Sequence, residues 1–239
     1  NLAALTDLLP TGEDRLGGQF HIDVSVAGTI GAPTASGGIS ISHGSYNSVA
    51  TGMALTDIGL SVVGNRDRLE VRNFTARDSG GGNLTVSGAV NLTATPGPAL
   101  DIKVELHRLQ ALNIDEVQAK ASGEVAVTGT LAAPQIRAQI TVDQAAVNIP
   151  EQLPQSVQPV PAVIINSKTG QTLSSPDAGA AGLFAIALDA RIKIPGPVFV
   201  RGRGLDSEWL GNLTVSGTTA APVLVGKLQV TRGSFSFIG

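Results

Sequence analysis

The sequence predicts an all-β protein, an elongated and twisted sheet that curls into a hydrophobic groove, with a short helix at its N-terminal end. Long stretches alternate between apolar and polar residues, glycines and prolines separate these stretches, and one strand-and-turn pattern recurs along the 239 residues. Alternation bounded by glycine and proline is typical of strands that bury one face. Aromatic residues make up only 3% of the chain and 29 residues are glycine, which favours a thin, turn-rich sheet over a compact enzyme core.

Residues 1–16 are predicted to form a short amphipathic helix and a lead-in to the sheet. Leucines recur there at helical spacing and Pro10 ends the run, as shown by Leu2, Leu5, Leu8 and Leu9. We expect this helix to pack against the end of the sheet. A membrane-contact helix is the alternative, and the absence of Lys and Arg from its polar side disfavours it.

The recurring pattern is V-x-G-T followed by a proline, at Pro33, Pro134 and Pro222. Counting from each proline, apolar residues fall at +6 and +8, a small residue at +11 and a large one at +13. The copies lie 101 and 88 residues apart, so each period must hold several strands. The repeat therefore predicts one sheet extended by stacking, with a first part over residues 17–149 and a C-terminal part over residues 183–239.

Within these parts we expect about fifteen strands, which at ~4.8 Å per strand gives a stack on the order of 70 Å long. The alternation slips by one residue near Arg72-Asn73, which predicts a bulge. In Asn212–Gly239 the pattern predicts three strands, with turns at Gly217-Thr218 and Gly233. The glycine-rich run Asp78–Leu84 predicts a hairpin connection rather than a calcium-binding turn, because such turns need stacked copies to complete each ion's shell.

Residues 150–182 are predicted to form a long proline-rich loop. Five prolines interrupt it and cannot donate to a strand ladder, namely Pro150, Pro154, Pro159, Pro161 and Pro176. The run Val163–Ile165 is the candidate within it for pairing with a sheet edge.

Composition excludes several classes of function. The formal charge of −3 gives no basic footprint for nucleic acid, and the absence of cysteine excludes disulfides and thiolate metal sites. A membrane-spanning helix requires ~18–20 consecutive apolar residues, and no stretch of the sequence approaches that length. We interpret the chain, which starts at Asn1 and shows no signal peptide, as a fragment of a longer protein.

No set of residues predicts catalysis, a metal site or a cofactor. The three histidines, His21, His43 and His107, have no partner at metal-ligand spacing. The sequence contains no GxSxG elbow, no GxxxxGK[ST] phosphate loop and no HExxH motif. We therefore predict that the protein is not an enzyme.

Two features resemble the TamB family, the translocation and assembly module proteins, and their AsmA-like relatives. One is the repeated V-x-G-T-x-x-x-P pattern, and the other is the VRGRGL…W.G.L.V.GT run within Ile194–Thr218. The resemblance implies a U-shaped β structure in the periplasm, held at the inner membrane by an anchor outside this fragment. It also implies passive conduction of phospholipid between the inner and outer membranes, a TamA-type outer-membrane barrel partner, and support of outer-membrane protein assembly.

The groove is predicted to be lined by the aliphatic positions of the alternating strands, where phospholipid acyl chains would lie. They are Val26, Ile39, Ile41, Val86, Val90, Ile102, Val104, Val127, Ile140, Val142, Ile186, Leu188, Ile192, Leu228 and Val230. A partner or headgroup contact is predicted at Arg201, Arg203 and Trp209, in what we expect to be one loop. A surface ion-pair network with a tryptophan anchoring the turn is the alternative there.

Two other functions remain open. The first is an assembly module that captures client strands along a sheet edge, at Val163–Ile165 or Ser234–Gly239, without lipid transport. The second is an adhesin-like β-solenoid, for which shorter and more regular repeats are expected.

Overall fold

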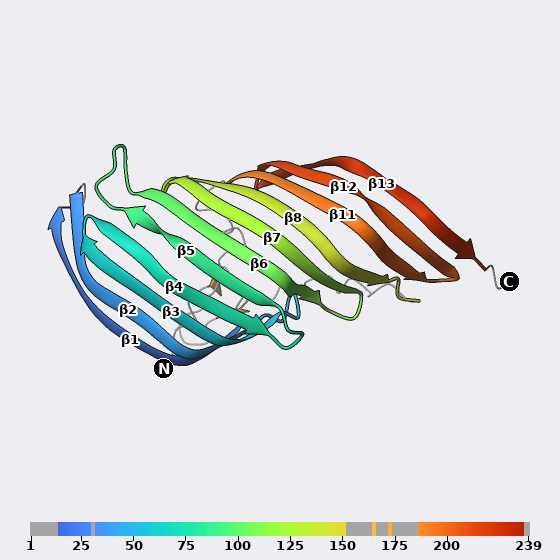
Figure 1. Cartoon of the computed structure of the whole chain (residues 1–239), viewed down its shortest axis with the longest axis horizontal. Coiled ribbons are helices and arrows are strands. Elements are labelled where there is room, and N and C mark those ends of the chain that lie inside the picture. Colours follow the sequence, from blue (N-terminus) through green and yellow to red (C-terminus); the bar gives the residue numbers. More distant parts are fainter. Residues whose placement is uncertain (1–13, 30–31, 152–163, 166–171, 174–185, 237–239) are drawn as a thin grey trace.

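The computed structural model describes residues 14–29, 32–151, 164–165, 172–173 and 186–236 (Figure 1). These residues form strands and turns, with no helix among them. The helix predicted within residues 1–16 falls on residues 1–13 and so lies outside the described part of the chain. The prediction of an all-β, curled and elongated sheet is confirmed.

One sheet contains eleven of the strands, fewer than the fifteen expected, and their order in space follows their order in the chain. Along that sheet they are β1 (Arg15–Thr29), β2 (Ala32–Asn47), β3 (Ala54–Arg66), β4 (Arg68–Asp78), β5 (Asn83–Asn91), β6 (Ala99–Asn113), β7 (Val117–Thr130), β8 (Ala133–Asn148), β11 (Ala187–Gly202), β12 (Leu205–Thr218) and β13 (Ala221–Phe235). Neighbours pair antiparallel except β8 and β11, which pair parallel. β1 and β13 form the two edges of this sheet.

The parallel pair determines which strand ends the proline-rich segment joins. Because Ala187 pairs with Gln135 at the start of β8, the end of β8 and the start of β11 lie at opposite ends of these two neighbouring strands. Within that connection, β9 (Ile164–Ile165) pairs antiparallel with β10 (Thr172–Leu173) in a two-stranded sheet of its own. The described part of the candidate edge-pairing run thus pairs locally and not with an edge of the large sheet.

Each copy of the sequence repeat is one hairpin, formed by β1–β2, β7–β8 or β12–β13. The V-x-G-T residues end the first strand and Ala-Pro starts the second. The repeat glycines Gly28, Gly129 and Gly217 have φ of 94°, 92° and 93°, a region that side chains strongly disfavour. The same turn is therefore built three times, as the repeat predicts.

The repeat also carries a β-bulge, which explains its three-residue step from +8 to +11. The pairing shifts between Ile41 and Gly44 in β2, at Asp143 in β8 and at Thr231 in β13. An inserted residue of this kind bends the strand. It also lets the small residue at +11 lie on the same face of the sheet as the apolar residues at +6 and +8. The turn predicted at Gly233 is consequently wrong, since the slip in alternation marks a bulge and β13 continues to Phe235.

These irregularities join into a bulge line that crosses the sheet, formed by Gly18, His43, Asp57, Arg108, Asp143, residues 195–197 and Thr231. We call the part of the sheet toward the β1–β2, β3–β4, β5–β6, β7–β8 and β12–β13 turns the rim side. The opposite part, toward the β2–β3, β4–β5, β6–β7 and β11–β12 turns, is the clasp side. The rim side follows the upper edge of the ribbon in Figure 1 and the clasp side the lower edge. The bulge predicted near Arg72-Asn73 is confirmed and lies apart from this line, on the rim side.

A small buried cluster sits along the bulge line between β2 and β6. Its buried members are Leu55, Ile58, Ala76 and Leu109, and Tyr46, Met53, Phe74, Leu84 and Leu106 pack around them. The β4–β5 hairpin, which lies between β3 and β6, is short: β4 ends at Asp78 and β5 begins at Asn83. The longer strands β3 and β6 therefore come together beyond the β4–β5 turn. This cluster is the main core of the described structure.

Backbone contacts hold that convergence, and we call the residues that make them the clasp: Thr51-Gly52, Asp78–Gly82 and Leu109–Asn113. The Asn113 N–H donates to the Thr51 carbonyl at 2.8 Å, and a Cβ added at Gly52 would collide with the Asn113 carbonyl. The Asp78 carboxylate accepts from the backbone N–H groups of Gly80, Gly82 and Gln110, at 2.8, 2.7 and 2.6 Å. Asp78–Gly82 is thus the hairpin connection that the sequence predicts.

Candidate functional site

The most extensive chemical feature of the molecule is the apolar face of the sheet. Residues that pair across neighbouring strands share a face, so the register gives its composition directly. One row crosses all eleven strands through Ile22, Ile39, Val62, Val71, Gly88, Ile102, Val127, Ile136, Leu188, Gly217 and Pro222. A second crosses them through Phe20, Ile41, Leu60, Phe74, Val86, Val104, Val125, Ala138, Ala190, Val215 and Leu224. Neither row contains a polar side chain.

All fifteen predicted lining residues have the strand parity of this face. Ile39, Ile102, Val127 and Leu188 belong to the first row, and Ile41, Val86 and Val104 to the second. Val26 and Val90 lie nearer the turns of the rim side, with Ile186 just before β11. Ile140, Val142, Ile192, Leu228 and Val230 lie at or near the bulge line. Their assignment to a lipid groove is an inference and belongs with the function proposed below.

This face is open rather than sealed. Away from the cluster at the bulge line, the buried apolar residues of the described chain are Ala89, Ala138, Ala145 and Ile194. The larger residues of both rows are half-buried in the middle of the sheet and become exposed at its edges, where Ile22 is 53% and Leu224 62% exposed. A contiguous exposed apolar surface of this kind marks a site of interaction.

The opposite face of the sheet is polar. Lys103 forms ion pairs with Glu105 at 2.7 Å and Glu124 at 3.3 Å. The hydrogen-bonded ammonium lowers the pKa of Glu105, and Glu105 first and Glu124 second raise the pKa of Lys103. Because all three side chains are exposed, this network is screened by salt and adds little to stability.

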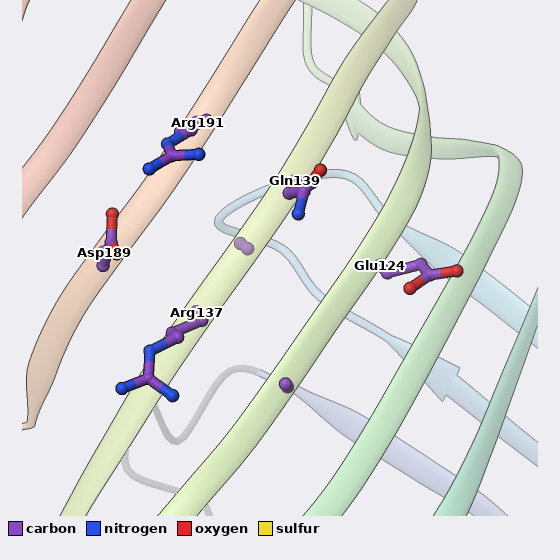
Figure 2. Close-up of a pocket in the computed structure, with 7 residues that line it drawn as sticks. Glu124, Arg137, Gln139, Asp189 and Arg191 are labelled. Carbon is purple, nitrogen blue, oxygen red and sulfur yellow. The ribbon is translucent and has the colours of Figure 1, made fainter.

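A shallow hollow on the polar face lies where β7, β8 and β11 run side by side. Figure 2 shows Arg137 and Gln139 on β8, flanked by Glu124 of β7 and by Asp189 and Arg191 of β11. The hollow thus carries charges of both signs. Among the described residues no group of three or more His, Cys, Asp and Glu could hold a metal ion.

The predicted contact residues Arg201, Arg203 and Trp209 do not share one loop. Arg201 lies in β11, stacks over Phe199 with 5.2 Å to the ring centroid, and its Nε pairs with Asp206 at 3.2 Å. Arg203, in the β11–β12 turn, donates to two backbone carbonyls of residues 150–151.

Trp209 lies on the other face of the sheet from Arg201, in register with Val198 and Val230. Its indole N–H donates to Ser207 Oγ at 2.9 Å. Both arginines and the indole thus have partners within the chain, and a contact of these residues with a partner or headgroup stays a prediction.

Several members of the apolar face are missing from the residues predicted from sequence, among them Phe20, Leu60, Val62, Val125 and Ile136. Their period-two spacing from predicted neighbours was the signal that could have found them. The cluster residues Leu55 and Leu109 had no such signal, because bulges break the period beside them.

The comparison with protein families gives a direct result: the model of the TamB C-terminal domain matches residues 72–239, well over half of the chain. The chain belongs to the TamB family. The match runs from within β4 to the end of the chain and includes the second and third repeat hairpins. Membership assigns this TamB domain to a family of non-enzymatic cell-envelope proteins.

One curated relative of this TamB domain is Protein TIC236, chloroplastic, of Arabidopsis thaliana, with 26% identity over 138 residues. The alignment covers 56% of this chain but only 6% of the relative, so the chain spans a small part of that protein's length. No solved structure matches the chain. No helix among the described residues is long and apolar enough to cross a membrane.

Proposed function

We propose that this TamB domain is a passive conduit for phospholipid, in which an acyl chain lies on the apolar face and the headgroup stays in water. The observation that carries the proposal is the pair of apolar rows that cross all eleven strands without a polar side chain. An acyl chain can therefore move from strand to strand without meeting a charge. Family membership supports a place in the periplasm, as part of a protein anchored in the inner membrane.

The energetics suit transfer rather than storage. Burying a methylene group gains ~0.8 kcal/mol relative to water, so about ten buried methylenes gain about 8 kcal/mol. A membrane offers the same gain, and the net free energy of moving a chain from the membrane to the sheet is therefore close to zero. A conduit needs this balance, because a tight site would not release its cargo. Apolar rows without polar groups also give little discrimination between headgroups.

The proposal is tested by native mass spectrometry of the protein purified without detergent from a periplasmic expression host. Ile140→Asp places a carboxylate on the apolar face of β8, where Ile140 is half-buried. Thr141→Asp is the matched control, because the next residue along the strand faces the other side. We expect phospholipid adducts on the unaltered protein and on Thr141→Asp, and their loss on Ile140→Asp with the fold retained.

Two outcomes contradict the conduit. A clean, lipid-free mass of a stably folded protein means that the apolar face does not hold lipid. Unfolding of Ile140→Asp in a urea or thermal melt, with Thr141→Asp still folded, means that Ile140 lies in a closed core.

The second candidate is an assembly module that pairs with client strands, and the β13 edge favours it. All fifteen residues Ala221–Phe235 are exposed and no strand among the described residues pairs with their outer side. Unpaired edges of this length are templates for strand addition. A TamA-type outer-membrane barrel is the partner we propose for this activity. Protection of β13 amides from hydrogen exchange by such a barrel supports it, and unchanged exchange at saturating barrel contradicts it.

A further inference from the structure

The two sides of the bulge line differ in whether their apolar face is continuous. On the rim side, both apolar rows pass through every strand from β1 to β13. On the clasp side, the apolar face is interrupted. A short row of Leu16, Tyr46 and Leu55 crosses β1 to β3. A second row runs from β6 onward, through Leu112, Ala119, Ala145, Val198, Trp209 and Val230. Between β3 and β6 no apolar row joins these two, because β4 and β5 stop short and Asp78 is the residue in register with Leu55.

The space on the clasp side between β2 and β6 is already filled by the protein itself. Leu55 is 5% and Leu109 4% exposed, and Tyr46 and Met53 pack against them. The clasp closes this region with hydrogen bonds from Gln110 to Asp78 and from Asn113 to Thr51. An acyl chain could enter only by displacing buried side chains.

The rim side offers enough length for one acyl chain laid along a strand. From Leu100 to Leu106 the apolar face of β6 extends about 20 Å at ~3.4 Å per residue. A bilayer core of about 30 Å holds two opposed layers of acyl chains, so one chain needs about 15 Å. A chain that starts at the turns of the rim side thus ends before the bulge line.

We infer that, from β2 to β6, the acyl chain is confined to the rim side, with its headgroup at the turns of that side and its terminal methyl toward the bulge line. The clasp and the buried cluster act as the floor of the lipid path and take no part in binding. This inference rests on the conduit proposed above and adds to it the boundary of the path and the orientation of the lipid.

Site-specific photo-crosslinking tests the boundary with two aromatic positions on adjacent strands. Phe20 lies in the second apolar row on the rim side, and Tyr46 packs on the cluster at the clasp side. Replacing either by p-benzoylphenylalanine keeps an aromatic ring in place. The probe is vesicles of phosphatidylethanolamine and phosphatidylglycerol with a tritiated acyl chain, and Ile102→p-benzoylphenylalanine adds a rim-side position in the middle of the sheet.

We expect labelled lipid on the variants at Phe20 and Ile102, and background labelling on the variant at Tyr46. Equal labelling at Tyr46, in a variant whose thermal melt matches the unaltered protein, overturns the boundary and leaves the conduit standing. Labelling at none of the three positions overturns the conduit itself.

If the variant at Tyr46 fails to fold, a second measurement tests the same boundary on the unaltered protein. Phospholipid with a diazirine at the terminal methyl is expected to label the rim-side strand residues that precede the bulge line, such as Leu106. Phospholipid with a diazirine in the headgroup is expected to label the turns of the rim side. Labelling of Thr51–Leu55 or Leu109–Asn113 by either probe overturns the inference.

Discussion

Leu55 of β3 and Leu109 of β6 lie in one buried cluster although β4 and β5 stand between their strands in the sheet. Two features bring them together. The intervening hairpin ends early, and bulges at Asp57 and Arg108 bend both longer strands at the same level. Within the described part of the chain, the sheet therefore makes a core from its own curvature.

Leu109→Ala tests that core. Removing a buried leucine side chain typically costs about 2–5 kcal/mol, and Leu109 is buried in the cluster. We expect the free energy of unfolding, measured by urea titration, to fall by that amount. Leu131→Ala is the matched control, since Leu131 is 59% exposed in the β7–β8 turn and its loss is expected to stay within about 0.5 kcal/mol. Equal losses for both variants would show that the cluster is not the main source of stability.

Asp78→Ala tests the clasp. The substitution leaves three backbone N–H groups, those of Gly80, Gly82 and Gln110, without their acceptor. Each buried donor left unpaired costs about 1–3 kcal/mol, so we expect a loss of at least that size. Hydrogen exchange of the Gln110 amide is the local readout and is expected to accelerate. The control is Asp115→Ala, an exposed aspartate of the β6–β7 turn, and a similar effect there would argue against a special role for Asp78.

Gly88→Ala tests the close approach of strands on the apolar face. Gly88 has φ of +132°, and a Cβ there would overlap the Asp101 carbonyl of the neighbouring strand. We expect destabilisation of more than about 1 kcal/mol in a thermal or urea melt. Gly97→Ala is the control, because a Cβ at that turn position meets nothing within 4 Å. A neutral Gly88→Ala variant would mean that β5 and β6 separate easily.

Lys103→Met tests the ion pairs of the polar face. Since the Lys103 ammonium lowers the pKa of Glu105, its removal is expected to return that pKa to the ordinary carboxyl range in an NMR titration. A carboxyl group whose pKa is lowered by folding stabilises the folded protein at pH values above the pKa of the unfolded state. That stabilisation is lost as the pH falls through the pKa of the folded state. Lys193→Met, on β11, is expected to leave Glu105 unchanged. An unaltered titration in Lys103→Met would show that the pair does not form in solution.

Much of this structure could be predicted from the sequence, because period-two alternation reports directly on a face. The offsets from Pro134 placed Ile140 and Val142 on the apolar face and Ala145 and Val147 after the bulge, all in one strand. The parallel pairing of β8 with β11 could not be predicted, since alternation is the same in parallel and antiparallel pairs.

The placement of Arg201 and Trp209 on opposite faces of the sheet could not be predicted from the sequence either. It depends on the irregular residues 195–197 in β11, which change how the following residues match β12. Likewise Leu109 follows Leu106 by three residues, so a strict alternation assigns it to the wrong face.

The distance from each repeat proline to its bulge varies by no more than one residue, and this near-constancy has a further consequence. Each strand that starts with Ala-Pro bends at nearly the same distance from its turn, so a new hairpin of this kind would align with the existing ones. A gene that duplicates such a unit lengthens the molecule while its cross-section stays the same. Length can thus evolve to match the gap that a protein has to bridge, with no redesign of its profile.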